Sequence, residues 1–127
     1  MSNYYTMMSS SMCVPEEKQI EVVEMFDRLK EEDCGIEGVL AYADAGHVVF
    51  VAEENFFPEN FCFAAAAIVD KFEILEPFLC SWAYSCDKEI IDAFGGGAAA
   101  IIRGQEPYIV DAFAEVNDFV NRQLIRG

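Results

Sequence analysis

The amino-acid sequence predicts an α+β fold: an antiparallel sheet of four to five strands, two helices on one face of the sheet, and a further C-terminal helix. Three observations lead to this prediction. The 127 residues suit a single domain, because two separate cores would each be too small to be stable. The hydrophobic fraction of 54% is too high for a disordered acidic chain. Finally, a pattern of one helix followed by two strands occurs twice.

The first half of the chain is expected to form a strand, a helix and a hairpin. Residues 3–14 alternate loosely between apolar and polar side chains, as a strand does. Pro15 begins a helix, because the first helical turn tolerates the missing N–H of proline, and Gly35 ends it. Strands at residues 39–44 and 47–52 follow on either side of a tight two-residue turn. The apolar stripe of the helix comprises Ile20, Val22, Val23, Phe26 and Leu29.

The second half repeats this order and adds the last helix. A helix over residues 58–75 has almost no polar side in its alanine-rich middle, so it is expected to be largely buried or closely overlain. Strands are expected at residues 78–86 and 97–103, where apolar and aromatic residues follow turn signals. Apolar residues at helical spacing predict the C-terminal helix over residues 110–125.

The two halves share a helix–strand–strand unit, at residues 15–53 and 58–103 of a single domain that spans residues 1–127. A proline followed by glutamate begins both helices. An acidic, a basic and an apolar residue then occur at the same offset in each helix, at residues 27–29 and 70–72. Collinear matches of this kind indicate an internal repeat. A duplicated unit would place its strands in one sheet and both helices on the same face.

The chain is strongly acidic, with 23 Asp and Glu against 8 Lys and Arg and a formal net charge of −15. This balance argues against direct binding of nucleic acid or of an anionic membrane, because phosphate contacts require basic side chains. Carboxylates at helical spacing can instead imitate phosphates and occupy a basic channel, although the commoner role of such charge is a solvated surface. The acidic ridge predicted on the first helix consists of Glu17, Glu21, Glu24 and Glu31.

The connection between the last two predicted strands, residues 87–96, is longer than the turn in the first unit and is expected to form a second binding surface. Its glycines could cradle a phosphate, but no Walker lysine follows them and carboxylates crowd the segment. The simpler interpretation is that these glycines prevent steric clashes beside the next strand. The residues expected to contact a partner are Asp87, Glu89, Asp92, Phe94, Gly95 and Gly96.

Aromatic side chains suggest an alternative function, the binding of a small molecule. Tyr42, His47, Trp82 and Tyr84 could line a ligand pocket, and the protein would then bind or sequester a compound such as a nucleotide. Core and cross-strand packing is the more common role of aromatic residues in a sheet.

No catalytic or metal-binding signature is present in the sequence. His47 is the only histidine, and the five cysteines form no CxxC pair. No enzymatic activity, metal or cofactor is therefore expected. The sequence has no N-terminal signal pattern and no stretch of about 20 apolar residues. A cytoplasmic protein with reduced, mostly buried thiols is the resulting prediction.

Two segments resemble a group of known proteins. The sequence SWAYSC at residues 81–86, followed by DAFGGGA at residues 92–98, resembles small acidic proteins encoded by phages and mobile elements. Residues 3–7 are similar to the start of the same group, whereas the last helix does not match. The resemblance implies an inhibitor of host defence, of the anti-CRISPR or anti-restriction type, and it carries over no catalytic residue.

These observations together predict a non-enzymatic, phage-encoded interaction protein of the host cytoplasm. It would block a nucleic-acid-handling defence complex by binding a host protein that has a basic surface, through the acidic ridge and the segment at residues 87–96. A homodimer joined through the alanine-rich strand is a further alternative, because small side chains at residues 98–100 allow close packing of another element.

Overall fold

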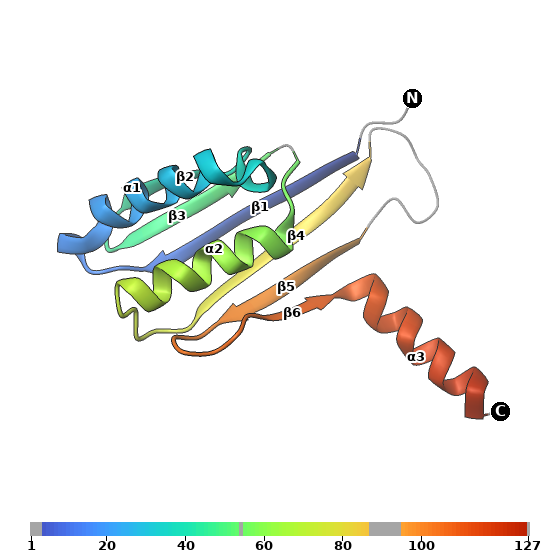
Figure 1. Cartoon of the computed structure of the whole chain (residues 1–127). Helices are drawn as coiled ribbons and strands as arrows, with labels where there is room; N and C mark the ends of the chain where they lie inside the picture. Colours follow the sequence, from blue (N-terminus) through green and yellow to red (C-terminus); the bar gives the residue numbers. More distant parts are fainter. Residues whose placement is uncertain (1–3, 54, 87–94, 127) are drawn as a thin grey trace.

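The computed structural model describes residues 4–53, 55–86 and 95–126, in the order β1–α1–β2–β3–α2–β4–β5–β6–α3 (Figure 1). The strands are β1 (Tyr4–Cys13), β2 (Leu40–Asp44), β3 (His47–Ala52), β4 (Phe78–Cys86), β5 (Gly95–Ile101) and β6 (Tyr108–Asp111). The helices are α1 (Glu16–Glu32), α2 (Pro58–Lys71) and α3 (Ala112–Arg126), and a 3-10 turn, Cys34–Ile36, follows α1.

All the strands pair antiparallel in one open sheet, in the spatial order β2-β3-β1-β4-β5-β6. Two β-α-β crossovers build its centre. β1 and β2, joined by α1, flank β3, and β3 and β4, joined by α2, flank β1. This is the split β-α-β arrangement of ferredoxin-like sheets, extended at one edge by β5 and β6. The predicted α+β class is confirmed, with six strands in place of the four to five expected.

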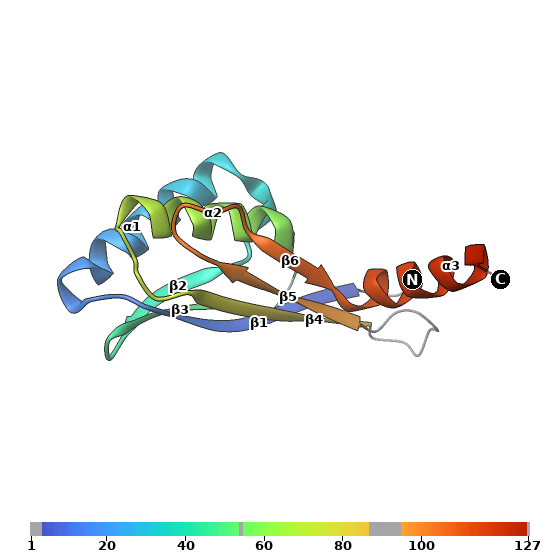
Figure 2. The ribbon, with the colours of Figure 1, turned by 90° about the horizontal axis from the view of Figure 1, so that it is seen from below.

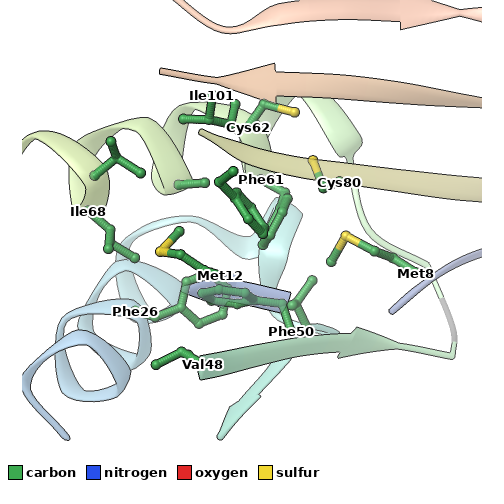
Figure 3. Close-up of a cluster of buried hydrophobic side chains, with 14 of the residues drawn as sticks. Met8, Met12, Phe26, Val48, Phe50, Phe61, Cys62, Ile68, Cys80 and Ile101 are labelled. Atoms are coloured by element: carbon green, nitrogen blue, oxygen red, sulfur yellow. The ribbon is translucent and has the colours of Figure 1, made fainter. Parts of the chain in front are cut away.

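α1 and α2 both lie on the same face of the sheet, as predicted (Figures 1 and 2). The core between the helices and the sheet is built around a cluster of phenylalanines (Figure 3). Phe50 of β3 meets Phe26 of α1 and Phe61 of α2 at ring-centroid distances of 5.0 and 5.3 Å, both nearly edge to face. Phe78 of β4 extends the cluster, 6.2 Å from Phe61. Edge-to-face pairs add about 0.5–1.5 kcal/mol each to the burial of their rings, so this cluster fixes the helices on the sheet.

α1 begins and ends close to the predicted positions, but its inward side differs from the expected stripe. Pro15 precedes the first turn, where Glu16 and Glu17 suit the positive end of the helix dipole. Gln19 is buried, because its Nε2 donates a 3.0 Å hydrogen bond to the Val14 carbonyl. Ile20, which was expected in the apolar stripe, is exposed. The buried side of α1 is formed by Gln19, Val22 and Phe26, and Ile20 is turned about 100° away from Gln19 toward solvent.

The edge of the sheet contains a strand, β6, that was not predicted from the sequence, and its last two residues, Val110 and Asp111, were expected to begin the last helix. Val110 lies in β6, opposite Ala98 of β5, and α3 begins only at Ala112. Four residues are too few to show a strand period, so only pairing with β5 identifies β6. Gly95 and Gly96, expected in the connecting segment, belong to β5.

Steric space explains one of the glycines in β5. A Cβ atom on Gly97 would lie 2.6 Å from the Val110 carbonyl oxygen and 2.7 Å from Cζ2 of the Trp82 ring. Gly97 thus lets the indole of β4 pack flat against β5. This agrees with the interpretation that glycines here prevent clashes.

The β2–β3 turn is as tight as predicted. Ala45 and Gly46 both have positive φ angles, 42° and 87°. Two successive positive φ values are typical of the type I′ turn that matches strand twist in a hairpin. The helix–strand–strand order occurs twice, as α1–β2–β3 and α2–β4–β5, although β2 is an edge strand and β4 lies inside the sheet. An internal sequence repeat stays a prediction.

Candidate functional site

The acidic ridge lies on the outward side of α1. All four of its glutamates, Glu17, Glu21, Glu24 and Glu31, are exposed, while Val22 and Phe26 on the opposite side are buried. Residues three and four apart on a helix have Cβ atoms about 5–6 Å apart, so Glu17, Glu21 and Glu24 are closely spaced carboxylates, and Arg28 lies between them and Glu31. With a rise of about 1.5 Å per residue, the ridge is about 21 Å long.

Little positive charge neutralises this ridge. Lys18 turns away from it, because its Nζ donates a 3.0 Å hydrogen bond to the Phe72 carbonyl at the C-terminal end of α2. There the ammonium group satisfies the negative end of that helix dipole. Arg28 is exposed on the same side as the ridge. Within the described part of the chain, the one ion pair joins Arg103 to Glu73, at 3.4 Å, so the ridge carboxylates have no ion-pair partner there.

A groove between the C-terminal end of α1 and the N-terminal half of α2 adjoins the ridge. This helix groove has a volume of about 490 Å³. Asp33 helps to shape it, because its carboxylate accepts hydrogen bonds from the Gly35 N–H at 2.8 Å and from the Asn60 side chain at 3.1 Å. The groove is lined by Leu29, Glu32, Asp33, Ile36, Asn60, Phe63, Ala64 and Ala67.

Sequence reasoning missed the helix groove because it expected α2 to be largely buried. Phe63 is 54% exposed, and Ala67 is exposed too. A signal was present in the sequence: a helix that is apolar on every side and lies in the outer of two layers must expose one apolar side. The structure thus brings an exposed aromatic ring next to a carboxylate row.

The second predicted surface falls mainly outside the described residues. Asp87, Glu89, Asp92 and Phe94 are not among them. Gly95 and Gly96 are described, and they pair with Tyr84 and Ala83 as part of β5.

The aromatic residues of the alternative ligand pocket do not come together. Tyr42 and His47 lie on the face of the sheet that the helices leave uncovered, and both are exposed. Trp82 and Tyr84 point to the helix face, and two strands separate β4 from β2. The Trp82 Nε1 donates a 3.1 Å hydrogen bond to the Tyr84 hydroxyl, and burial raises the pKa of Tyr84. Trp82 therefore belongs to the core, Tyr84 packs partly buried against it, and the four residues do not line one pocket.

Four cysteines, Cys13, Cys34, Cys62 and Cys80, are free thiols in two settings. Cys62 and Cys80 are buried beside each other in the core (Figure 3), and their mutual hydrogen bond, with burial, raises the pKa of Cys62 far above its usual range. Cys13 and Cys34 are exposed, so the expectation of mostly buried thiols is wrong for these two. Among the described residues, no three His, Cys, Asp or Glu side chains are placed to hold a metal ion.

The uncovered side of the sheet is a further surface, named the open face here (Figure 2). The strand register places on it the residues that alternate with the core positions. Small side chains at its centre leave two shallow hollows, of about 460 and 330 Å³. The open face comprises Met7, Ser9 and Ser11 of β1, Leu40 and Tyr42 of β2, Val49 and Val51 of β3, Leu79, Ser81 and Ala83 of β4, Ala98 and Ala100 of β5, and Tyr108 and Val110 of β6.

Comparison of the chain with protein-family models, with curated protein sequences and with solved structures gave no match. The resemblance to small phage proteins therefore stays a prediction. No helix in the described segments is both long enough and apolar enough to pass through a membrane.

Proposed function

We propose that the protein is a non-enzymatic, acidic interaction protein that binds a basic surface of a nucleic-acid-handling host protein. In this proposal it is a phage-encoded inhibitor that acts in the host cytoplasm against a defence complex, of the anti-CRISPR or anti-restriction type. One observation carries the proposal: the exposed carboxylates of α1, which have no ion-pair partner among the described residues, lie beside a groove that contains an exposed phenylalanine.

The acidic ridge supplies speed and selectivity of association. Exposed charges add little to affinity individually, but a row of one sign steers a basic partner and raises the association rate at low salt. A nucleic-acid-binding protein presents such a basic row to its own ligand, because phosphate contacts dominate its affinity. The acidic ridge would occupy that site as a competitor.

The helix groove offers the apolar contact area that exposed charges alone do not provide. Interfaces gain most of their binding energy from a few desolvated side chains near the centre, often aromatic or Arg, surrounded by weaker polar contacts. Phe63 and Leu29 provide an apolar floor, and Glu32 lies at its margin. An arginine of the partner, with its apolar stem on Phe63 and its guanidinium on Glu32, fits this chemistry.

The binding test compares two variants with the same change in net charge. The ridge variant carries Glu17→Gln, Glu21→Gln and Glu24→Gln, and the control carries Asp44→Asn, Glu53→Gln and Glu106→Gln, which are exposed but not on α1. Each tagged protein is incubated with host lysate at several salt concentrations, and the captured proteins are identified. We expect nucleic-acid-binding proteins on the wild type and the control, with capture that weakens as salt rises, and a loss of capture by the ridge variant.

Two outcomes would contradict this proposal. Equal capture by the ridge variant and the control would mean that the charge serves solubility only. Capture that is insensitive to salt and contains no nucleic-acid-binding protein would refute the basic partner. A second assay addresses the biological role: expression in a host with an active CRISPR or restriction system should raise the plating efficiency of a targeted phage, and Phe63→Ala should reduce that gain.

A further inference from the structure

α3 leaves the rest of the molecule with one apolar side uncovered. Its main contacts are with β5 and β6, and it points away from the sheet in both views (Figures 1 and 2). Its described apolar residues recur three and four positions apart, so they share one side of the helix. These residues, all exposed, are Val116, Phe119, Val120 and Leu124. A helix of this length gains most of its stability from packing of its apolar side, so α3 needs a surface to pack on.

The open face also exposes apolar side chains that packing against another element would stabilise. Leu40, Leu79 and Tyr108 are among the most exposed large apolar side chains of the chain's described part. The hollow of about 330 Å³ lies over the alanines of β5, between Leu79 and Tyr108. Small residues at such a position allow another backbone to approach closely, and large ones on either side hold it in place.

α3 cannot reach the open face of its own chain. No residue separates Asp111, the last of β6, from Ala112, the first of α3. Without a connecting loop the helix continues outward from the edge of the sheet, and it cannot reverse across the face. The open face of a second copy has no such restriction. We propose that two copies of this chain form a dimer in which α3 of each copy packs across the open face of the other.

The charge of the molecule favours this mode of self-association. Two chains of net charge −15 repel each other less where they meet over a surface with few carboxylates. On the open face of the described residues, the charged groups are at one end of β2 and β3, where Asp44 and His47 pair, and beside the hollow of about 460 Å³, which Glu53 lines. The other titratable groups there, Cys13, Tyr42 and Tyr108, are thiols and phenols rather than carboxylates. The acidic ridge lies on the opposite side of the sheet, with α1 (Figure 2).

The dimensions also match. α3 has 15 residues and a length of about 22 Å at 1.5 Å per residue. The open face measures about 24 Å across its strands at a spacing of about 4.8 Å. Two such helix-on-sheet contacts, one from each copy, approach the roughly 800 Å² per partner that a stable interface of standard size buries. A two-fold dimer makes both contacts at once, because each copy presents the same two surfaces.

The oligomeric state of the full chain tests the proposal. Sedimentation velocity of the wild type at micromolar concentration should show a dimer. Ala98→Arg in the hollow and Phe119→Asp on α3 should each shift the mass to that of a monomer. The matched control, Leu75→Asp, changes an apolar residue that is 82% exposed outside both surfaces, and it should remain a dimer. Far-UV circular dichroism and thermal unfolding verify that each variant is folded; Leu79→Lys and Leu124→Lys replace any that is not.

Mixing the two monomeric variants distinguishes helix exchange from simple stacking of two sheets. Ala98→Arg retains an intact α3, and Phe119→Asp retains an intact open face. Together they can form one of the two contacts, so a heterodimer that is weaker than the wild-type dimer is expected. A monomeric wild type, a dimer that both variants leave intact, or a mixture that does not associate would each overturn the proposal. None of these measurements involves the partner of the acidic ridge.

Discussion

The two faces of the sheet are made by the same strands, but only one of them is covered by helices. Phe78 and Leu79 are neighbours on β4, and they are 1% and 68% exposed respectively. Phe78 belongs to the phenylalanine cluster beneath α2, whereas Leu79 borders a hollow on the open face. An antiparallel sheet with one solvated face normally carries polar residues there. The open face departs from that rule, which is why we regard it as an interaction surface.

Apolar side chains on a strand become part of a core only where another element packs on them. Leu79 and Tyr108 are large and mostly apolar, but no element within residues 4–53, 55–86 and 95–126 packs on them. The helices decide which face becomes the interior, because α1 and α2 both return to the same side of β1.

Truncation of neighbouring residues on β4 compares the faces directly. Phe78→Ala should lower the free energy of unfolding by about 3–5 kcal/mol, because it removes a buried ring and leaves a cavity. Leu79→Ala should change it by no more than about 0.5 kcal/mol, as expected for an exposed position. Urea unfolding at concentrations low enough to populate the monomer measures both. A large effect of Leu79→Ala under these conditions would contradict the assignment of an uncovered face.

A methyl group added on the covered face of β5 tests the packing of Trp82. Gly97→Ala should lower the free energy of unfolding by about 1–3 kcal/mol. The added Cβ would lie 2.7 Å from the indole ring of Trp82, so either the ring or the strand must move. Gly95→Ala is the matched control, since its Cβ would lie 3.6 Å from Tyr84, an ordinary contact. The fluorescence of Trp82, the only tryptophan, should shift to longer wavelength in Gly97→Ala alone.

The burial of Tyr84 predicts a pH dependence at high pH, which the hydrogen bond from Trp82 opposes in part because its N–H favours the phenolate. Burial raises the pKa of Tyr84 above its usual value near 10, because the phenolate is disfavoured in the core. The contribution of protonated Tyr84 to the stability of the folded protein is therefore complete below about pH 10. It is lost as the pH rises through the pKa that Tyr84 has in the folded protein, which is higher than its pKa in the unfolded chain. Thermal unfolding should show a decrease in Tm above pH 10 that is smaller in Tyr84→Phe. At neutral pH, Tyr84→Phe should lower the free energy of unfolding by about 1 kcal/mol, because the indole N–H of Trp82 loses its acceptor.

The smallest change in stability is expected for substitutions in the turn between β2 and β3. This turn sets the register of the two strands, and the register determines which of their side chains lie on the open face. Ala45 has a φ of 42°, a region that side chains with a Cβ disfavour, although Asn adopts it more readily than Ala. Ala45→Asn should raise the free energy of unfolding by about 0.5 kcal/mol. Ala43→Asn, in the extended part of β2, should give no gain, because Asn is unfavourable in strands. Chemical denaturation of both variants measures the difference.

The candidate site shows where prediction from sequence reached its limit. The exposure of Glu17, Glu21 and Glu24 follows from helical periodicity, and the structure confirms it. Phe63 was missed, because the sequence does not reveal which side of an apolar helix faces the sheet. Tyr42 and Trp82 were grouped by residue type, although register and strand order put them on opposite faces, with two strands between.

Most of the local structure follows from short-range signals in the sequence. Periods of two and 3.6 residues, with Pro15 and Pro58 at helix starts, specify the helices and most strands, because these signals depend on backbone sterics and on nearby residues. The predicted glycine terminator of the first helix is wrong, because α1 ends at Glu32 with Asp33 as its C-cap and Gly35 lies in the 3-10 turn that follows. The net charge of −15 and its placement on α1 also follow from the sequence alone.

The spatial arrangement of these elements is visible only in the tertiary structure. The order of the strands, the addition of β6, the helix groove and the uncovered face all depend on contacts between residues far apart in the chain. Such contacts leave no short-range pattern. Gly97 illustrates the reason: its need for space comes from Trp82 on the neighbouring strand, and no property of its own segment reveals that. Likewise, the sequence of α3 shows an apolar side, but only the fold shows that nothing in the described part of the same chain covers it.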